Sequence, residues 1–284
     1  MNASMTITGA APLQYRAGKL RDYVFPLIAA LAVFALPFTY VMYAYILVGQ
    51  AHFLMAYLYQ YRGGKITKTY LFVALALGAA ATLYLTSGIG ITPLFIIAGT
   101  IFSAHFALDE FTLHGEPLSP SRIATIVGFA TLHSSLIIVV AFPTLSYLGF
   151  VVGGVLALLI LIRTLFGKSA PSRAEYYLWF IAAILFFFAT VIGMPSHILG
   201  IIVLLHFVNW YVGYGDRLKE VPAAARRYWK EVAATLALSS SLLLLYLLFS
   251  IPFLDVFFDL TYFYLWTAAH IVLSFVTATY RLER

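Results

Sequence analysis

Continuous apolar runs of about 20 residues, separated by short charged or Gly/Pro-rich breaks, constrain this chain more than any other feature of its sequence. A run of that length crosses the roughly 30 Å hydrocarbon core of a bilayer as an α-helix, whereas strands of a membrane barrel alternate apolar and polar residues. With 63% hydrophobic and only 10% charged residues, the chain also lies outside the range of soluble domains. The sequence therefore predicts an all-α, polytopic transmembrane helical bundle.

About ten spans are predicted, at 20–37, 40–61, 69–87, 91–114, 122–143, 146–166, 174–193, 196–215, 229–251 and 260–280. The first boundary is placed near Pro37, because one helix over 23–61 would be nearly twice as long as the core is thick. We expect a single transmembrane domain over 1–284, with a polar N-terminal segment at 1–19 that is not a removable signal peptide. The absence of cysteine excludes disulfides, thiolate metal sites and thiol catalysis.

The distribution of basic residues predicts the orientation of these spans. All 17 Lys and Arg residues fall in or beside the breaks at 1–19, 62–68, 115–122, 163–173, 216–230 and 281–284. The opposite breaks contain no basic residue and carry Asp255 and Asp259. The positive-inside rule then places both termini in the cytoplasm and predicts a multi-pass protein of the cytoplasmic (inner) membrane. The net charge of +6 indicates contact with anionic lipid headgroups and requires no nucleic-acid partner.

Histidines are the most informative residues within the spans. Five of the seven lie about ten residues from the predicted cytoplasmic end of their span, hence about 15 Å inside the bilayer and near its midplane. These five are His52, His105, His133, His206 and His270. A single intramembrane histidine is often only an interhelical hydrogen-bonding residue, but a shared depth on five helices favours a common polar or metal centre. His114 and His197 are predicted to lie at helix ends.

Ligand chemistry limits which centre these histidines can form. Several neutral imidazoles without thiolate suit iron, copper or zinc. Asp109 follows His105 by one helical turn and can act as a ligand or orient an imidazole, whereas Glu110 is rotated by roughly 100° and can orient a histidine of a neighbouring helix. Alternatively, either carboxylate is a hydrogen-bonded packing residue. Three residues that follow His206 are predicted to line the same cavity: Asn209, Trp210 and Tyr211.

The aromatic content predicts the nature of the substrate. The chain contains 24 Phe, 20 Tyr and 4 Trp, and a midplane cavity lined by such rings would suit a long apolar molecule that arrives through the lipid. Other classes are disfavoured. The chain has no Gly-rich phosphate loop with its lysine, and no mid-span lysine for a Schiff base to retinal.

Four motifs, taken in order, resemble a known family. They are "SAHFALDEF" at 103–111, "ATLHSSLIIV" around His133, "LLHFVNWYV" around His206 and "TAAHIVLSF" around His270. Their order and approximate spacing are similar to the Brp/Blh family of membrane β-carotene 15,15′-dioxygenases, polytopic proteins in which a histidine-ligated non-haem iron cleaves β-carotene to retinal. The resemblance runs from about residue 45 to 280 and marks this chain as a divergent member.

The resemblance implies a ligand set. By position, His52, His105, His206 and His270 match family histidines, and Glu110 stands where the family's "HFGxxD"-like motif has its aspartate. Two departures are visible. The family's first motif looks like "PHGALD", whereas residues 51–56 read "AHFLMA". The family has a second histidine where this chain has Trp210, so one family ligand is missing unless His133 or His270 replaces it.

The resulting expectation is an Fe(II)-dependent oxygenase that uses O2 to cleave or oxidise a carotenoid-like apolar polyene, with β-carotene to retinal favoured. Copper, zinc and haem stay open as alternatives. Facing histidines could instead ligate haem in an electron carrier. A lipid-chain desaturase or hydroxylase ranks lower, because such enzymes carry clustered histidine boxes and this chain has no HxxxH. A proton-relay transporter lacks the expected broken helices.

Overall fold

The computed structural model describes residues 21–166, 171–193 and 197–278, so the predicted polar segment at 1–19 lies outside the described residues. Ten longer α-helices follow one another: α1 Arg21–Ala35, α2 Phe38–Arg62, α3 Lys68–Thr86, α4 Ile91–Leu113, α5 Pro120–Ala141, α6 Tyr147–Phe166, α7 Arg173–Phe186, α8 Ile198–Leu218, α9 Pro222–Phe249 and α11 Leu260–Thr277. The short elements are η1 Pro143–Leu145, one π-helical turn η2 Phe187–Val191, η4 Pro252–Leu254 and α10 Asp255–Phe258.

The predicted class is confirmed: the described chain forms a multi-pass, all-α bundle. Nine of its apolar segments are long enough to cross a membrane, and a tenth, Val24–Ala35 in α1, is shorter. The break near Pro37 is also confirmed, since α1 ends at Ala35 and α2 begins at Phe38. A proline disfavours helical geometry in the residue before it, which explains why the chain turns here. The cytoplasmic placement of both termini stays a prediction.

One helix boundary differs clearly from the sequence-based prediction. α9 begins at Pro222, not at 229, and its first turns carry three basic residues of the predicted break, Arg226, Arg227 and Lys230. Proline is well tolerated in the first turn of a helix, where its missing N–H costs nothing. The long α9 therefore extends beyond its apolar part. Glu231 ties this end of α9 to α2, because its carboxylate accepts hydrogen bonds from Arg62 at 2.8 Å and from the Tyr59 hydroxyl at 2.9 Å. Arg227, one turn earlier on α9, donates to the same carboxylate at 2.9 Å.

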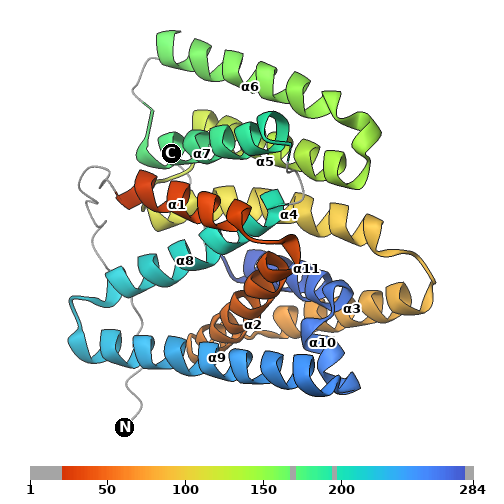
Figure 1. Cartoon of the computed structure of the whole chain (residues 1–284). Helices are drawn as coiled ribbons and strands as arrows, with labels where there is room; N and C mark the ends of the chain where they lie inside the picture. The colour runs from red at the N-terminus through yellow and green to blue at the C-terminus, as the bar shows by residue number, and fades with distance from the viewer. Residues whose placement is uncertain (1–20, 167–170, 194–196, 279–284) are drawn as a thin grey trace.

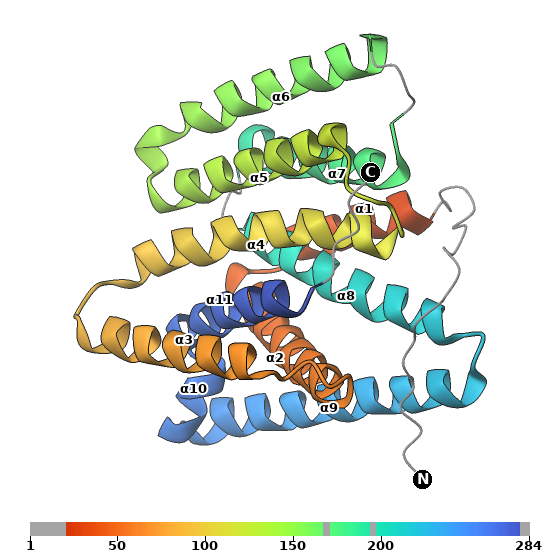
Figure 2. The same cartoon turned by 180° about the vertical axis from the view of Figure 1, so that it is seen from behind.

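The helices do not all take equal parts in the bundle. Figure 1 shows α6 at one edge and α9 at the opposite edge, with α8 crossing obliquely between the two halves. The reverse view in Figure 2 shows α11 beside α4 and α3, in agreement with their contacts. Buried residues make up 61% of the apolar stretch of α8, 56% in α7 with η2, 50% in α2 and 44% in α4, but only 6% in α3 and in α6. The centre of the bundle is therefore built mainly by α2, α4, α7 and α8, and α11, which is 33% buried, packs against α2 and α4. α3 and α6 present their side chains outward.

Candidate metal centre

Four of the predicted histidines converge at this centre, one from each of α2, α4, α8 and α11. Their ring centroids form a closed circuit: His52 lies 5.4 Å from His206 and 5.0 Å from His270, while His105 lies 5.1 Å from His206 and 5.9 Å from His270. All four side chains are buried. The common depth predicted from the sequence thus corresponds to one compact group, which we call the histidine ring.

Close helix packing brings these side chains together. Gly49 lies one turn before His52 on α2, and a Cβ at this position would lie 2.7 Å from Cε2 of Phe263 and 3.0 Å from Cε2 of Phe207. Both distances are shorter than a normal carbon contact, so only glycine leaves room for the two rings. Those rings belong to α11 and α8, which carry His270 and His206. The small residue on α2 therefore lets its two partner helices approach the ring.

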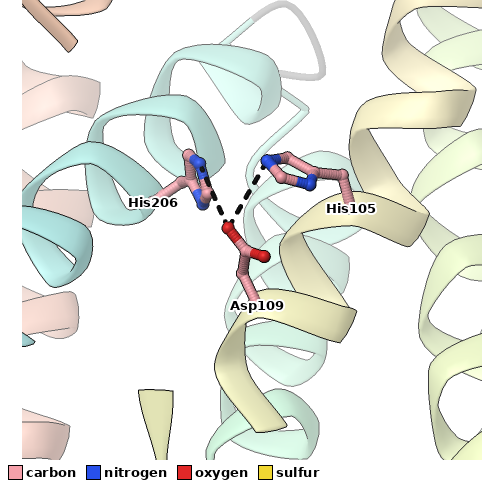
Figure 3. A group of neighbouring side chains, drawn as sticks. All are labelled: His105, Asp109 and His206. Atoms are coloured by element: carbon pink, nitrogen blue, oxygen red, sulfur yellow. Dashed lines mark ion pairs between the residues drawn. The ribbon is translucent and has the colours of Figure 1, made fainter. Parts of the chain in front are cut away.

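Asp109 is the carboxylate that joins the histidine ring. Its Oδ2 lies 3.4 Å from Nε2 of His105 and 4.0 Å from Nε2 of His206, and Figure 3 shows the three side chains pointing toward one another from α4 and α8. One ligand atom from each of these residues lies within 4.8 Å of the other two. Such a group can close around a single ion. The Asp109 side chain is 21% exposed, so the ring is not fully sealed on this side.

The ring nitrogens test whether a metal fits. Within the described part of the chain, six buried nitrogens of the ring have no hydrogen-bond partner: Nδ1 of His52, both nitrogens of His105, both of His206 and Nδ1 of His270. Buried polar atoms are normally satisfied, and leaving one without a partner costs about 1–3 kcal/mol. A neutral imidazole always has one nitrogen with a free lone pair, which is the form that binds iron, copper or zinc. The residues present therefore fit a metal ion.

Aromatic side chains surround the histidine ring. His52 lies against Phe207 at 4.7 Å and Trp210 at 4.7 Å, and Phe53 lies 4.9 Å from His270. Further rings face His206 and His105 from α4 and α11: Phe102, Phe106 and Phe275. The sequence reasoning missed these phenylalanines, and nothing distinguishes them from the many others in the chain except their position near a motif histidine. They make the surroundings of the ring apolar.

His133, predicted as a further candidate ligand, lies apart from the ring. It is fully buried on α5, its Nδ1 is 2.5 Å from Oγ of Ser103, and its ring stacks on Phe129 at 6.3 Å. Among the described residues no ring contact joins it to the other four. The Ser103 hydroxyl donates to the carbonyl of Gly99, so the histidine nitrogen donates to the serine oxygen. This arrangement is that of an interhelical hydrogen-bonding residue between α4 and α5.

The other predicted site residues divide between two places. Trp210 and Tyr211 lie against His52, at ring centroid distances of 4.7 and 6.0 Å. Asn209 faces away from the ring, and its Nδ2 donates to Oε1 of Glu110 at 3.0 Å and to the hydroxyl of Tyr177 at 2.6 Å. The structure therefore does not bring Glu110 to the histidine ring, although it follows Asp109 directly; the histidine near its carboxylate is His114, at 3.8 Å.

Two more histidines lie at helix ends, as predicted. His114 follows the last residue of α4, and its Nδ1 donates to the carbonyl of Glu110 at 2.7 Å. His197 precedes α8, and its Nε2 donates to the carbonyl of Leu36 at 3.2 Å, in the break between α1 and α2. Tyr177 was not predicted as a site residue, because no pattern marks it among the other tyrosines.

The fold and the histidine ring define a class: a polytopic α-helical membrane protein with four buried histidines in contact. Two of them, His105 and His206, form with Asp109 a group that could hold a metal ion. No protein-family model, curated protein or solved structure matches this chain. The resemblance to the Brp/Blh family stays a prediction that rests on the four motifs.

Proposed function

We propose that this protein is a non-haem iron oxygenase of the cytoplasmic membrane that cleaves or oxidises a carotenoid-like polyene with O2, and that β-carotene is converted to retinal. The observation that carries the proposal is the histidine ring: four buried imidazoles on four helices, with unpartnered nitrogens and one carboxylate beside them. Intramembrane ionisable residues are costly, and a group of five at one place supports a functional role.

The proposed ligands are His52, His105, His206 and His270, with Asp109 as a fifth ligand or as the carboxylate that orients the imidazoles of His105 and His206. Bound Fe(II) would supply the electrons and the open coordination positions for activating O2. Nitrogen ligands of this kind also bind copper and zinc, and the choice of iron rests on the motif resemblance.

Packing of the rings favours a single ion over haem. Each histidine of the ring contacts two others at centroid distances of 5.0 to 5.9 Å, and aromatic side chains fill the surrounding space. A porphyrin between two axial histidines would need a flat slot that separates them from all other side chains. Four imidazoles in such a closed circuit leave no such slot. We therefore prefer the oxygenase to an electron carrier.

The protein's own residues would bind the polyene and keep water away from it. Trp210 stands where the resembled family has another histidine, and its ring is edge-on to His52 at 4.7 Å. Here it narrows the polar centre and offers an aromatic face to a conjugated chain. Asp109 is the partly exposed member of the group, at 21%, and Phe275 of α11 is 36% exposed and lies 5.8 Å from His105. A substrate dissolved in the bilayer would enter between α4 and α11.

Metal analysis of the purified protein tests the proposed centre. The wild-type protein is expected to bind about one iron per chain, and His105→Ala and His206→Ala are expected to lose it. His133→Gln is the matched control, because this histidine is equally buried and lies outside the ring. Wild-type protein without iron, copper or zinc would overturn the proposal, as would loss of metal from the control alone.

Expression in a β-carotene-accumulating bacterium tests the reaction separately. We expect the orange colour to fade and retinal to appear in the extract, and we expect cells with the His206→Ala variant to stay orange. If cells that contain iron-loaded wild-type protein keep their colour and their β-carotene, this substrate is wrong and another apolar substrate must be sought.

A further inference from the structure

A cavity separate from the histidine ring is lined by both polar and apolar residues, and the metal site does not use it. It has a volume of about 270 Å³, is open on one side, and is lined by residues of α1, α4, α7 and α8 and by His114 at the end of α4. Its polar lining consists of Glu110, His114, Arg173, Tyr177 and Asn209. Most of the remaining wall is apolar, with Phe25 and Pro26 from α1 and four residues from α4 and α8: Leu113, Val208, Val212 and Gly213. None of the four ring histidines lines it.

Its polar groups are arranged as a hydrogen-bonding site. Glu110 is 1% exposed and Tyr177 is 4% exposed, so both were taken out of water when the chain folded. The side-chain amide of Asn209 donates one hydrogen bond to Oε1 of Glu110 at 3.0 Å and one to the hydroxyl of Tyr177 at 2.6 Å. The hydroxyl of Tyr177 accepts from Asn209, and no described residue accepts its own hydrogen. A buried hydroxyl normally donates its hydrogen, so a ligand oxygen in the cavity would satisfy it.

The charges in the cavity favour a neutral ligand. Oε2 of Glu110 lies 3.8 Å from Nδ1 of His114, and Arg173 also lines the wall. With a carboxyl group and two basic side chains in the lining, the cavity matches neither an anionic nor a cationic ligand well. A neutral ligand with a carbonyl oxygen requires only a hydrogen-bond donor, which the Tyr177 hydroxyl supplies. Phe25 of α1 lines the cavity and is 41% exposed, so the cavity reaches the surface of the bundle past an apolar side chain. An opening of this kind suits a ligand with an apolar tail.

We propose that this cavity binds the carbonyl-bearing ring of a lipid-soluble quinone, with its tail leaving along α1. The volume of about 270 Å³ is below the usual range for a whole drug-sized ligand, roughly 300–1,000 Å³, so it suits a ring and not a complete polyene. The hydroxyl of Tyr177 donates to a ring carbonyl, and Asn209 holds that hydroxyl in place. The proposal goes beyond the oxygenase and does not depend on the metal.

Binding of labelled decylubiquinone to the full chain in nanodiscs, compared with empty nanodiscs, tests the proposal. We expect saturable binding with one site per chain. Tyr177→Phe, which removes only the hydroxyl, and Asn209→Leu are each expected to weaken binding roughly tenfold, the usual effect of losing a buried hydrogen bond. Tyr70→Phe is the matched control, because its hydroxyl makes a comparable 3.0 Å bond to Gln60 on another surface. It is expected to change affinity less than about twofold.

Probes with the same tail and a charged head separate the alternatives. Decanoate and decylamine are expected to compete at least roughly tenfold more weakly than the quinone, because the cavity has no net preference for either charge. Tighter binding of either probe overturns the assignment to a neutral ring, and so does quinone binding that Tyr177→Phe leaves unchanged. The two proposals can fail separately. If the purified protein contains no iron but still binds the quinone after treatment with a chelator, the quinone site stands and only the oxygenase is refuted.

Discussion

Replacement of Asp109 by asparagine gives a quantitative test of the histidine ring. Asparagine keeps the shape of the side chain and one oxygen, but removes the negative charge. In the structure this charge lies 3.4 Å from Nε2 of His105 and 4.0 Å from Nε2 of His206, so an ion held by these nitrogens would lie close to it. We therefore expect Asp109→Asn to weaken metal binding without abolishing it.

The size of the effect follows from distance and exposure. A divalent ion and one negative charge about 4 Å apart attract by about 2 kcal/mol in water and by about 8 kcal/mol at an effective dielectric constant of about 20. The side chain of Asp109 is 21% exposed and asparagine keeps one oxygen that can still bind the ion, so the net loss is expected near the lower limit, about 2 kcal/mol. This corresponds to roughly 30-fold in affinity. It also agrees with the roughly 10-fold to 100-fold loss that follows removal of a carboxylate that orients metal-bound histidines.

Titration with Co(II) against a competing chelator measures this affinity, because cobalt bound to nitrogen and oxygen ligands absorbs visible light and does not react with O2 as readily as Fe(II). Asp259→Asn is the matched control. Asp259 caps α11 by accepting from the backbone of Thr261 at 2.8 Å, and asparagine caps equally well. Unchanged affinity in Asp109→Asn, with binding lost in His105→Ala, would refute the inclusion of the carboxylate in the centre.

Three further substitutions probe the packing around the centre. Gly49→Ala should destabilise the protein by about 1–3 kcal/mol in detergent unfolding, because the added Cβ would lie 2.7 Å from a phenylalanine ring. The control Gly78→Ala, whose Cβ would have nothing within 4 Å, should be neutral or slightly stabilising. Equal stability of the two variants would contradict the close packing at Gly49. Ser103→Ala should cost about 1–3 kcal/mol and leave metal content unchanged, and a loss of metal would place His133 in the centre. Glu231→Gln should cost at most about 1 kcal/mol, less at high salt, and a salt-independent loss would show that the ion pairs do not hold α9 to α2.

The fold could be predicted from the sequence because a bilayer permits few alternatives. Once an apolar run is long enough to span, its backbone must be helical, and breaks such as Pro37 fix where one span ends. The start of α9 was missed because its first turns are charged. Hydropathy identifies the residues that lie in the bilayer, and a helix can extend beyond them into water. Which helices would be central was not predictable from hydropathy, since α3 and α6 are as apolar as the buried helices.

For the candidate site, the position of each histidine along its helix could be predicted from the sequence, but the direction in which its side chain points could not. Distance from a span end gave His133 the same depth as the four ring histidines, and only the rotation of α5 turns it toward Ser103 instead. Asn209 and Trp210 are neighbours in sequence, yet they belong to different sites. Successive residues on a helix point about 100° apart, so adjacency in sequence predicts separation in space.

α4 shows why one apolar helix carries so many polar residues. Ser103 contacts His133 on α5, His105 and Asp109 face His206 on α8, and Glu110 faces Asn209 in the cavity beyond. These side chains point in three directions around the helix, so α4 can keep them from lipid only if protein surrounds it on all three sides. Each polar group would otherwise be stranded in hydrocarbon, at a cost of several kcal/mol. The polar residues of α4 therefore require its central position, and that position places the histidine ring and the cavity on either side of the same helical turn.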